Sequence, residues 1–153
     1  MEEADLRVPT QPVEVTLVLR DGRRETVMLY LSGGARSHDG PETISDFLNE
    51  ARPFIPVRLA TGDSALFNRE AVLYVSAAKD AAGLDRLVGI PEVDLVRVEL
   101  EGGDELEGVL VHANPELRAR LSDHFNHHEL FFTLEMGDAV LFVNKRRVLT
   151  ILL

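Results

Sequence analysis

The sequence contains no cysteine and no tryptophan, and only 6% of its 153 residues are aromatic. Without cysteine, the chain has no disulfide framework, no thiolate nucleophile and no cysteine metal site. No apolar run reaches the roughly 18–20 residues that a membrane-spanning helix needs. The acidic start at residues 1–5 lacks the basic region of a secretory signal peptide. These absences predict a cytoplasmic protein without a membrane segment.

Basic residues are also scarce. Lys and Arg number 16 against 26 Asp and Glu, which gives a formal net charge of −10 at pH 7. Phosphate backbones and anionic membranes are bound mainly by clustered Lys and Arg. The charge therefore argues against nucleic acid as a partner and leaves only local basic clusters as candidates. A hydrophobic share of 45% is ordinary for a globular chain and excludes a disordered one.

Several sequence blocks occur twice in the same order, which indicates an internal duplication. Ile44–Asn49 matches Leu121–Asn126, which lies 77 positions later. Two further β-rich runs both end in an acidic residue followed by glycine. The matching pairs of blocks are 13–22 and 93–103, 44–49 and 121–126, 54–57 and 131–134, and 67–72 and 143–148.

Each copy predicts the same series of short elements. Apolar residues alternate through 13–20 and share one face of a strand. Asp21-Gly22 predicts a tight hairpin turn, and Thr43 or Ser45 is a candidate cap for a short helix that ends at Asn49. The predicted strands are 13–20, 23–31, 54–60, 64–68 and 71–76 in the first copy and 94–100, 104–112, 130–135, 139–143 and 147–152 in the second, whose helix is placed near 116–126.

Five short strands per copy are too few for a sandwich with a large core, but they suffice for a small, strongly bent barrel. We therefore predict an all-β protein with short helical inserts, built from two tandem five-stranded Sm-like or SH3-like barrels that pack as a pseudo-dimer. The predicted domains are an N-terminal tail (1–12), a first barrel (13–76), a linker (77–92) and a second barrel (93–153).

Three motifs resemble those of the Sm-like and SH3-like small β-barrels. They are the apolar strand Leu17–Gly22 and the turns that follow Asn68 and Asn144. The first copy is also similar to a group of uncharacterised bacterial single-barrel proteins, through 37–42, 45–49 and 54–57. The bacterial RNA chaperone of the Sm superfamily has a basic residue at the turn that corresponds to those after Asn68 and Asn144. The resemblance thus implies an alternative function, nucleic-acid binding by Asn68, Arg69, Asn144 and Lys145.

The main functional hypothesis is a non-enzymatic protein-interaction module, an adaptor or regulatory scaffold, because small barrels bind partners through edge strands and loops. Its partner is a protein of unknown identity, and the barrel edge strands also allow a homo-oligomer. Phe47 and Phe125 are equally suited to the barrel cores. The candidate contact residues are Arg36, His38, Asp46, Phe47, His124 and Phe125.

Catalytic and metal chemistry have less support. There is no Gly-x-Ser-x-Gly elbow and no phosphate-binding glycine loop, so we predict no enzyme and no cofactor. His124 and His128 would share one face of a helix, as two metal ligands do, but a zinc site needs three or four ligands. The acidic hairpin 99–107 and the basic run 145–147 each suit a binding role or a solvated turn.

Overall fold

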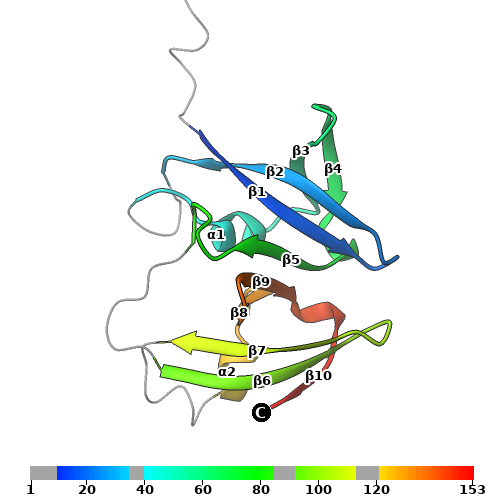
Figure 1. Cartoon of the computed structure of the whole chain (residues 1–153), viewed down its shortest axis with the longest axis vertical. Coiled ribbons are helices and arrows are strands. Elements are labelled where there is room, and N and C mark those ends of the chain that lie inside the picture. The colour runs from blue at the N-terminus through cyan, green and yellow to red at the C-terminus, as the bar shows by residue number, and fades with distance from the viewer. Residues whose placement is uncertain (1–9, 35–39, 85–91, 113–120) are drawn as a thin grey trace, which may run out of the picture.

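The computed structural model describes residues 10–34, 40–84, 92–112 and 121–153 (Figure 1). Ten antiparallel strands form one sheet with short helices inserted, which confirms the predicted all-β class. The strands are β1 (Thr10–Leu19), β2 (Arg24–Ser32), β3 (Phe54–Leu59), β4 (Ser64–Asn68), β5 (Val72–Ala78), β6 (Glu92–Leu100), β7 (Glu105–His112), β8 (Phe131–Met136), β9 (Ala139–Asn144) and β10 (Val148–Leu152). The helices are α1 (Ile44–Asn49), α2 (Leu121–Phe125) and the 3-10 turns η2 (Arg69–Ala71) and η4 (Lys145–Arg147).

The sheet divides into two halves of equal topology. We call residues 10–84 the N-terminal half and residues 92–153 the C-terminal half; one lies above the other in Figure 1. The strand order is β10-β6-β7-β8-β9-β5-β1-β2-β3-β4. In each half the first strand pairs with the second and the fifth, and the second, third and fourth follow in order. Two halves with the same strand order are what a duplicated sequence predicts.

Local sequence accounts for the shape of each half. The β1–β2 hairpin turns at Gly22, whose φ of +89° is costly for residues with a Cβ atom. Helix α1 begins after Thr43, which forms a capping box with Asp46. The Asp46 N–H donates to Thr43 Oγ1 at 3.1 Å, and the Thr43 N–H donates to Asp46 Oδ2 at 2.9 Å. Of the two caps considered from sequence, the chain therefore uses Thr43.

The two cores share side chains across the middle of the molecule. The core of the N-terminal half includes Phe131 and Phe142, which belong to β8 and β9. The core of the C-terminal half includes Leu73 and Tyr74 from β5. Neither half therefore buries its core by itself, in contrast to two barrels that are complete on their own. The reason is that β5 pairs with β9 across the halves.

The predicted segment boundaries differ from the strand ends by a few residues. Strand β1 begins at Thr10, within the predicted tail, and β5 extends to Ala78, within the predicted linker. Strand β6 begins at Glu92, one residue before the predicted second barrel. The predicted helix near 116–126 is seen only as α2, because residues 113–120 lie outside the described ranges. Within those ranges no helix is long and apolar enough to cross a membrane.

Candidate interaction surface

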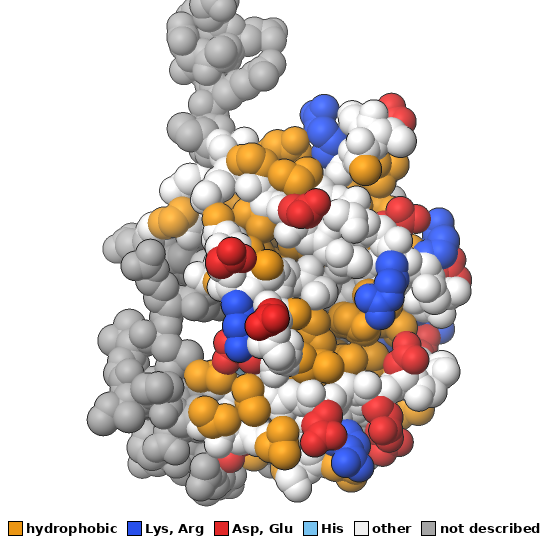
Figure 2. Space-filling view, in the orientation of Figure 1, with side chains coloured by type: hydrophobic (Ala, Val, Ile, Leu, Met, Phe, Trp, Pro, Cys, Tyr) orange, Lys and Arg blue, Asp and Glu red, His pale blue; other side chains and the backbone are white. Residues whose placement is uncertain are grey.

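Strands β5 and β9 form a joint between the two halves. Five residue pairs join them, from Tyr74 with Val143 to Ala78 with Ala139. Figure 2 shows hydrophobic side chains gathered between the halves on the face in view, with basic and acidic side chains beside them. The joint is thus a continuous sheet with an apolar interior and a charged rim.

Two asparagines satisfy backbone groups at the joint. Asn144 is fully buried; its Nδ2 donates to the Val72 carbonyl at 2.9 Å, and its Oδ1 accepts from the Arg146 N–H at 2.9 Å. Asn49, at the end of α1, accepts from the Phe131 N–H at 2.8 Å and donates to the Phe131 carbonyl at 3.3 Å. Both side chains therefore hold β8 and β9 to the N-terminal half.

Ion pairs surround the same joint. Arg147 reaches Glu101 at 3.2 Å and Glu70 at 3.3 Å, so it links the two turns that flank the joint. Arg146 also pairs with Glu70, and Arg20 pairs with Glu101. The hydrogen bond from Arg20 is the main cause that lowers the pKa of Glu101 below its ordinary value of 4.5.

The Glu101 carboxylate gives the joint a pH dependence. Because the folded-state pKa is lowered, ionised Glu101 stabilises the fold above about pH 4.5, and this stabilisation is lost as the pH falls through the lowered value. We expect Glu101→Gln to reduce Tm at pH 7, with the difference from wild type shrinking below pH 4.5. Thermal unfolding followed by circular dichroism from roughly pH 3 to pH 7 measures this difference in Tm.

Glu105→Gln is the matched control, because Glu105 is exposed in the same hairpin and its replacement removes the same charge. A Glu101→Gln effect that is independent of pH would contradict the role assigned to the carboxylate. So would an equal, parallel effect of Glu105→Gln, since that would reflect net charge alone.

Positions in the two halves correspond through their strand pairing. Asn68 and Asn144 each cap a 3-10 turn at the end of their half's fourth strand. Phe54 pairs with Asn68, and Phe131 pairs with Asn144. The fourth and fifth strands therefore correspond at an offset of 76 residues and the third strands at 77, as the repeated sequence blocks predict.

The outer edges of the sheet correspond to the two strands of the joint. Strand β4 is the counterpart of β9, and β10 is the counterpart of β5. Among the described residues, β4 and β10 are the two end strands of the sheet. Leu66 on β4 is 66% exposed, whereas its counterpart Phe142 is 2% exposed. Leu149 on β10 is 70% exposed, whereas its counterpart Leu73 is 4% exposed. The edges thus expose apolar residues at positions that the joint buries.

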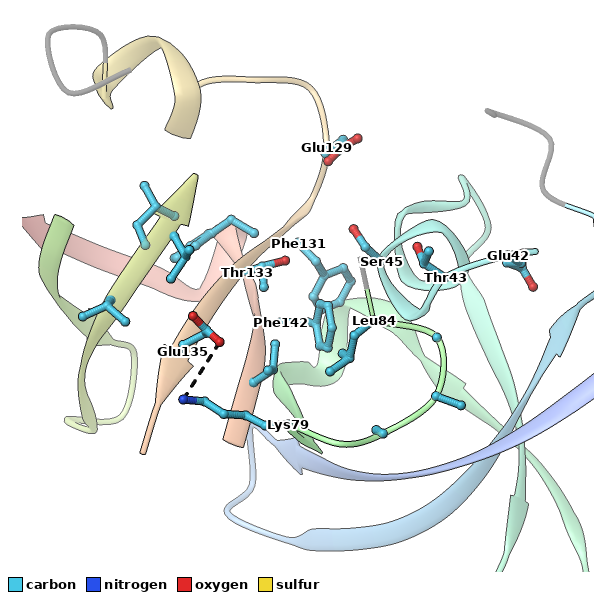
Figure 3. A pocket seen from close by; sticks show the side chains of 18 of the residues that line it. Glu42, Thr43, Ser45, Lys79, Leu84, Glu129, Phe131, Thr133, Glu135 and Phe142 are labelled. Carbon is cyan, nitrogen blue, oxygen red and sulfur yellow. Dashed lines mark ion pairs between the residues drawn. The ribbon is translucent and has the colours of Figure 1, made fainter. Parts of the chain in front are cut away.

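A shallow groove of about 310 Å³ runs beside β4 and is lined by Tyr30, Phe47, Pro56, Ala65 and Leu66, among others. Its counterpart in the C-terminal half is a larger cavity of about 1030 Å³, lined on one side by β7, β8 and β9. There, α1 and residues 79–84 of the other half form the opposite wall, with Phe131 and Phe142 between them (Figure 3). Lys79 pairs with Glu135 across this cavity. The groove beside β4 therefore corresponds to one wall of that cavity. In the C-terminal half the joint supplies the opposite wall, whereas the groove beside β4 has none among its lining residues.

A second cleft of about 540 Å³, which shares lining residues with the larger cavity, lies between α1 and η4 and brings three predicted residues together: Asp46, Arg69 and Lys145. Lys145 donates through Nζ to the His127 carbonyl at 2.9 Å, and Arg69 donates through Nε to the Leu48 carbonyl at 3.0 Å. Burial lowers the pKa of both side chains. The other charged residues of the cleft are Glu42, Glu50, Glu129 and Arg146.

This placement bears on the nucleic-acid alternative. Both candidate cations already bind backbone carbonyls. Asn144, named with them, is buried in the joint, while Asn68 is exposed and caps η2. Four carboxylates against three cations line the cleft, so it lacks the excess of positive charge that a phosphate backbone needs.

The predicted protein-contact residues have different surroundings. Phe47 is buried in the core of the N-terminal half, with Arg52 stacked over its ring at 4.3 Å, which agrees with its alternative role as a core residue. Phe125 is half-buried and packs edge-on against Phe132. His124 lines the cavity of the C-terminal half. Asp46 completes the capping box that Thr43 begins at α1, and Arg36 and His38 lie outside the described residues.

The helical pairing expected for His124 and His128 is wrong, because α2 ends at Phe125. The chain leaves the helix there to reach β8, whose first residue, Phe131, is buried. His128 instead lies beside His127, with ring centroids 4.1 Å apart. Among the described residues, no group of three or more His, Asp or Glu side chains is placed to hold a metal ion.

Sequence reasoning assigned Asn144 to nucleic-acid binding and not to the joint, and it missed Leu66 and Leu149, which distinguish the edges from the joint. Their signal was present, because the aligned blocks place apolar residues at the same positions of both fourth and both fifth strands. Comparison with models of known protein families, with curated proteins and with solved structures finds no match. The function must therefore be inferred from the geometry of this chain.

Proposed function

We propose that the protein is a non-enzymatic interaction module that binds a protein partner by adding a strand at the open edges β4 and β10. The observation that supports this most is the exposure of Leu66 and Leu149 at positions whose counterparts are buried in the joint. Exposed apolar edge strands are templates for pairing with another chain. In this mode of recognition, main-chain hydrogen bonds give affinity and alternate side chains give specificity.

The backbone of β4 is suited to this pairing. Hydrogen bonds join Leu59 N–H to the Asp63 carbonyl at 2.8 Å and Arg69 N–H to the Pro53 carbonyl at 2.8 Å. Bonded and non-bonded residue pairs alternate along an antiparallel ladder. The pair of Pro56 with Leu66 is therefore a non-bonded one, and the Leu66 N–H and carbonyl are directed away from β3. They remain available to an added strand.

The test is a tagged pull-down from the native host, with and without nuclease and at two salt concentrations. It compares wild type with Leu66→Lys and Leu149→Lys, because a lysine on an edge strand opposes strand addition. Leu95→Lys is the matched control, since Leu95 is 62% exposed but lies on β6, between β10 and β7. We expect a defined protein to be retained by wild type and Leu95→Lys and lost from at least one edge variant.

Two results would overturn the proposal. One is a protein that all four forms retain equally, because its binding would not involve the edges. The other is co-purifying nucleic acid that disappears at high salt, which would transfer the function to the cleft of Arg69 and Lys145.

A further inference from the structure

We propose that the cavity of about 1030 Å³ between the two halves is a binding site for a small organic cation, an ammonium group attached to an apolar body. None of the described residues that line it belongs to β4 or β10, so the inference does not depend on the proposed edge-binding function. Small-molecule sites usually measure roughly 300–1,000 Å³. The cavity therefore has room for an apolar body as well as the charged group.

The cavity has apolar walls that belong to both halves. Val109 and Val111 on β7 stand on one side, and Leu84 of the N-terminal half stands on the other (Figure 3). All three side chains are only partly buried. An apolar ligand body between them would remove more of their surface from water, which favours binding.

Glu135 supplies a negative charge that is only weakly compensated. Its side chain is 31% exposed and is directed toward Lys79 across the cavity (Figure 3). Among the described residues, Lys79 is the one cation within ion-pair distance, with its Nζ 4.0 Å from Glu135 Oε1. That separation is too long for a hydrogen bond, so the carboxylate can accept a shorter, charge-assisted bond from an ammonium group. Lys79 is 48% exposed, and a ligand can displace it easily because such surface ion pairs are weak.

Comparison of the two halves shows that this polarity is particular to the cavity. Glu135 and Thr133 correspond to Arg58 and Pro56, which lie 77 positions earlier on β3. The two earlier residues line the open groove beside β4 and are exposed, whereas Thr133 and Glu135 are half-buried. Burial disfavours polar and charged side chains that lack partners, yet the more enclosed copy has the hydroxyl and the carboxylate. A cationic ligand that supplies their partner accounts for both, and for the reversal of charge from Arg58 to Glu135.

The other charges at the cavity also favour a cation. With histidine counted as neutral, three carboxylates and two lysines line it; besides Glu135 and Lys79 these are Glu42, Glu129 and Lys145. Lys145 already donates to a backbone carbonyl at 2.9 Å. The whole chain has a formal net charge of −10, which raises the local concentration of cations.

The joint fixes the walls in position, so that binding requires little rearrangement. Strands β5 and β9 are joined by five residue pairs. The Asn49 side chain hydrogen-bonds both the N–H and the carbonyl of Phe131, which holds α1 beside β8. Val109 pairs with Glu135 and connects β7 to β8. A preformed site of this kind loses less conformational entropy when its ligand binds.

The experiment is isothermal titration calorimetry of the full chain at neutral pH and low salt. Its probes are phenethylammonium, phenethyl alcohol and 3-phenylpropionate, which have the same apolar body with a cationic, a neutral and an anionic end. We expect phenethylammonium to bind most tightly, because it alone brings a charged donor to Glu135. Glu135→Gln should weaken its binding about tenfold or more, the usual effect of losing a hydrogen bond to a charged group. Lys79→Gln should strengthen it, because this change removes the competing cation.

Arg58→Gln is the matched control, since Arg58 has the corresponding place on β3 but lines the open groove. We expect it to leave the affinity for phenethylammonium unchanged. The inference is overturned if phenethylammonium does not bind, or binds no more tightly than the alcohol and the propionate. It is also overturned if Glu135→Gln has no effect or if Lys79→Gln weakens binding. Circular dichroism verifies that each variant is folded.

The pull-down separates this inference from the proposed function. Because Glu135 lies on neither edge strand, Glu135→Gln should retain the protein partner that wild type retains. Failure of the calorimetry with an edge-dependent partner intact refutes the cavity site alone. Binding of phenethylammonium without any edge-dependent partner refutes the proposed function alone.

Discussion

Replacing Phe131 with alanine is expected to lower the free energy of unfolding by about 3–5 kcal/mol, which is the usual cost of deleting a buried aromatic ring. The side chain is 1% exposed and is the largest one that is fully buried. It lies in the core of the N-terminal half although it belongs to β8. The Asn49 side chain hydrogen-bonds both the N–H and the carbonyl of Phe131. Its loss therefore leaves a cavity where the two halves meet. Urea unfolding followed by circular dichroism measures the change.

Phe54→Ala is the matched control, because Phe54 occupies the corresponding position on β3 and is 47% exposed. Its replacement should cost about 1 kcal/mol or less, since little apolar area is lost from the core. Equal losses from the two substitutions would contradict the assignment of Phe131 as the residue that joins the halves.

The second large effect is expected for Asn144→Leu, which should lower the free energy of unfolding by about 2–4 kcal/mol. Leucine has nearly the same size but cannot hydrogen-bond. The change leaves the Val72 carbonyl and the Arg146 N–H without their partner in a buried joint. Because a buried polar group without a partner pays its full desolvation cost, the loss is larger than that of an ordinary exposed hydrogen bond. The same urea titration measures it.

Asn68→Leu is the control for this substitution. Asn68 has the same place in its half and accepts from the Glu70 N–H at 2.9 Å, but it is exposed. Losing that cap should cost about 1 kcal/mol, the usual value for an N-cap. If Asn144→Leu proves no more costly than Asn68→Leu, the amide of Asn144 does not hold the joint together.

Much of the secondary structure was predictable because its causes are local. Period-two apolar residues place β1 over Thr10–Leu19, close to the predicted 13–20. Gly22 and the Thr43 capping box act within a few residues of themselves. The second helix was predicted near 116–126 and its described part, α2, ends at Phe125, so only the helical pairing of His124 with His128 fails, because His128 lies beyond that end.

The candidate site was predictable only in part. Sequence placed Asp46, Arg69 and Lys145 in separate motifs, and the fold brings them into one cleft. It identified the edge strands as binding elements but not which two of the four corresponding strands remain at an edge. That choice depends on the pairing of β5 with β9, a contact between residues far apart in the chain. No local pattern encodes such a pairing, because all four strands have similar apolar sequences.

The sequence by itself determined two copies of one strand order and the hairpins and caps that build them. Only the tertiary structure decided which copy of each element is buried. Asn68 and Asn144 begin turns of the same kind, yet one is exposed and the other is fully buried. Leu66 and Phe142 differ in the same way. The physical reason is that a sheet built from two similar halves has one internal joint and two outer edges. Corresponding residues are therefore buried where they lie at the joint and exposed where they lie at an edge.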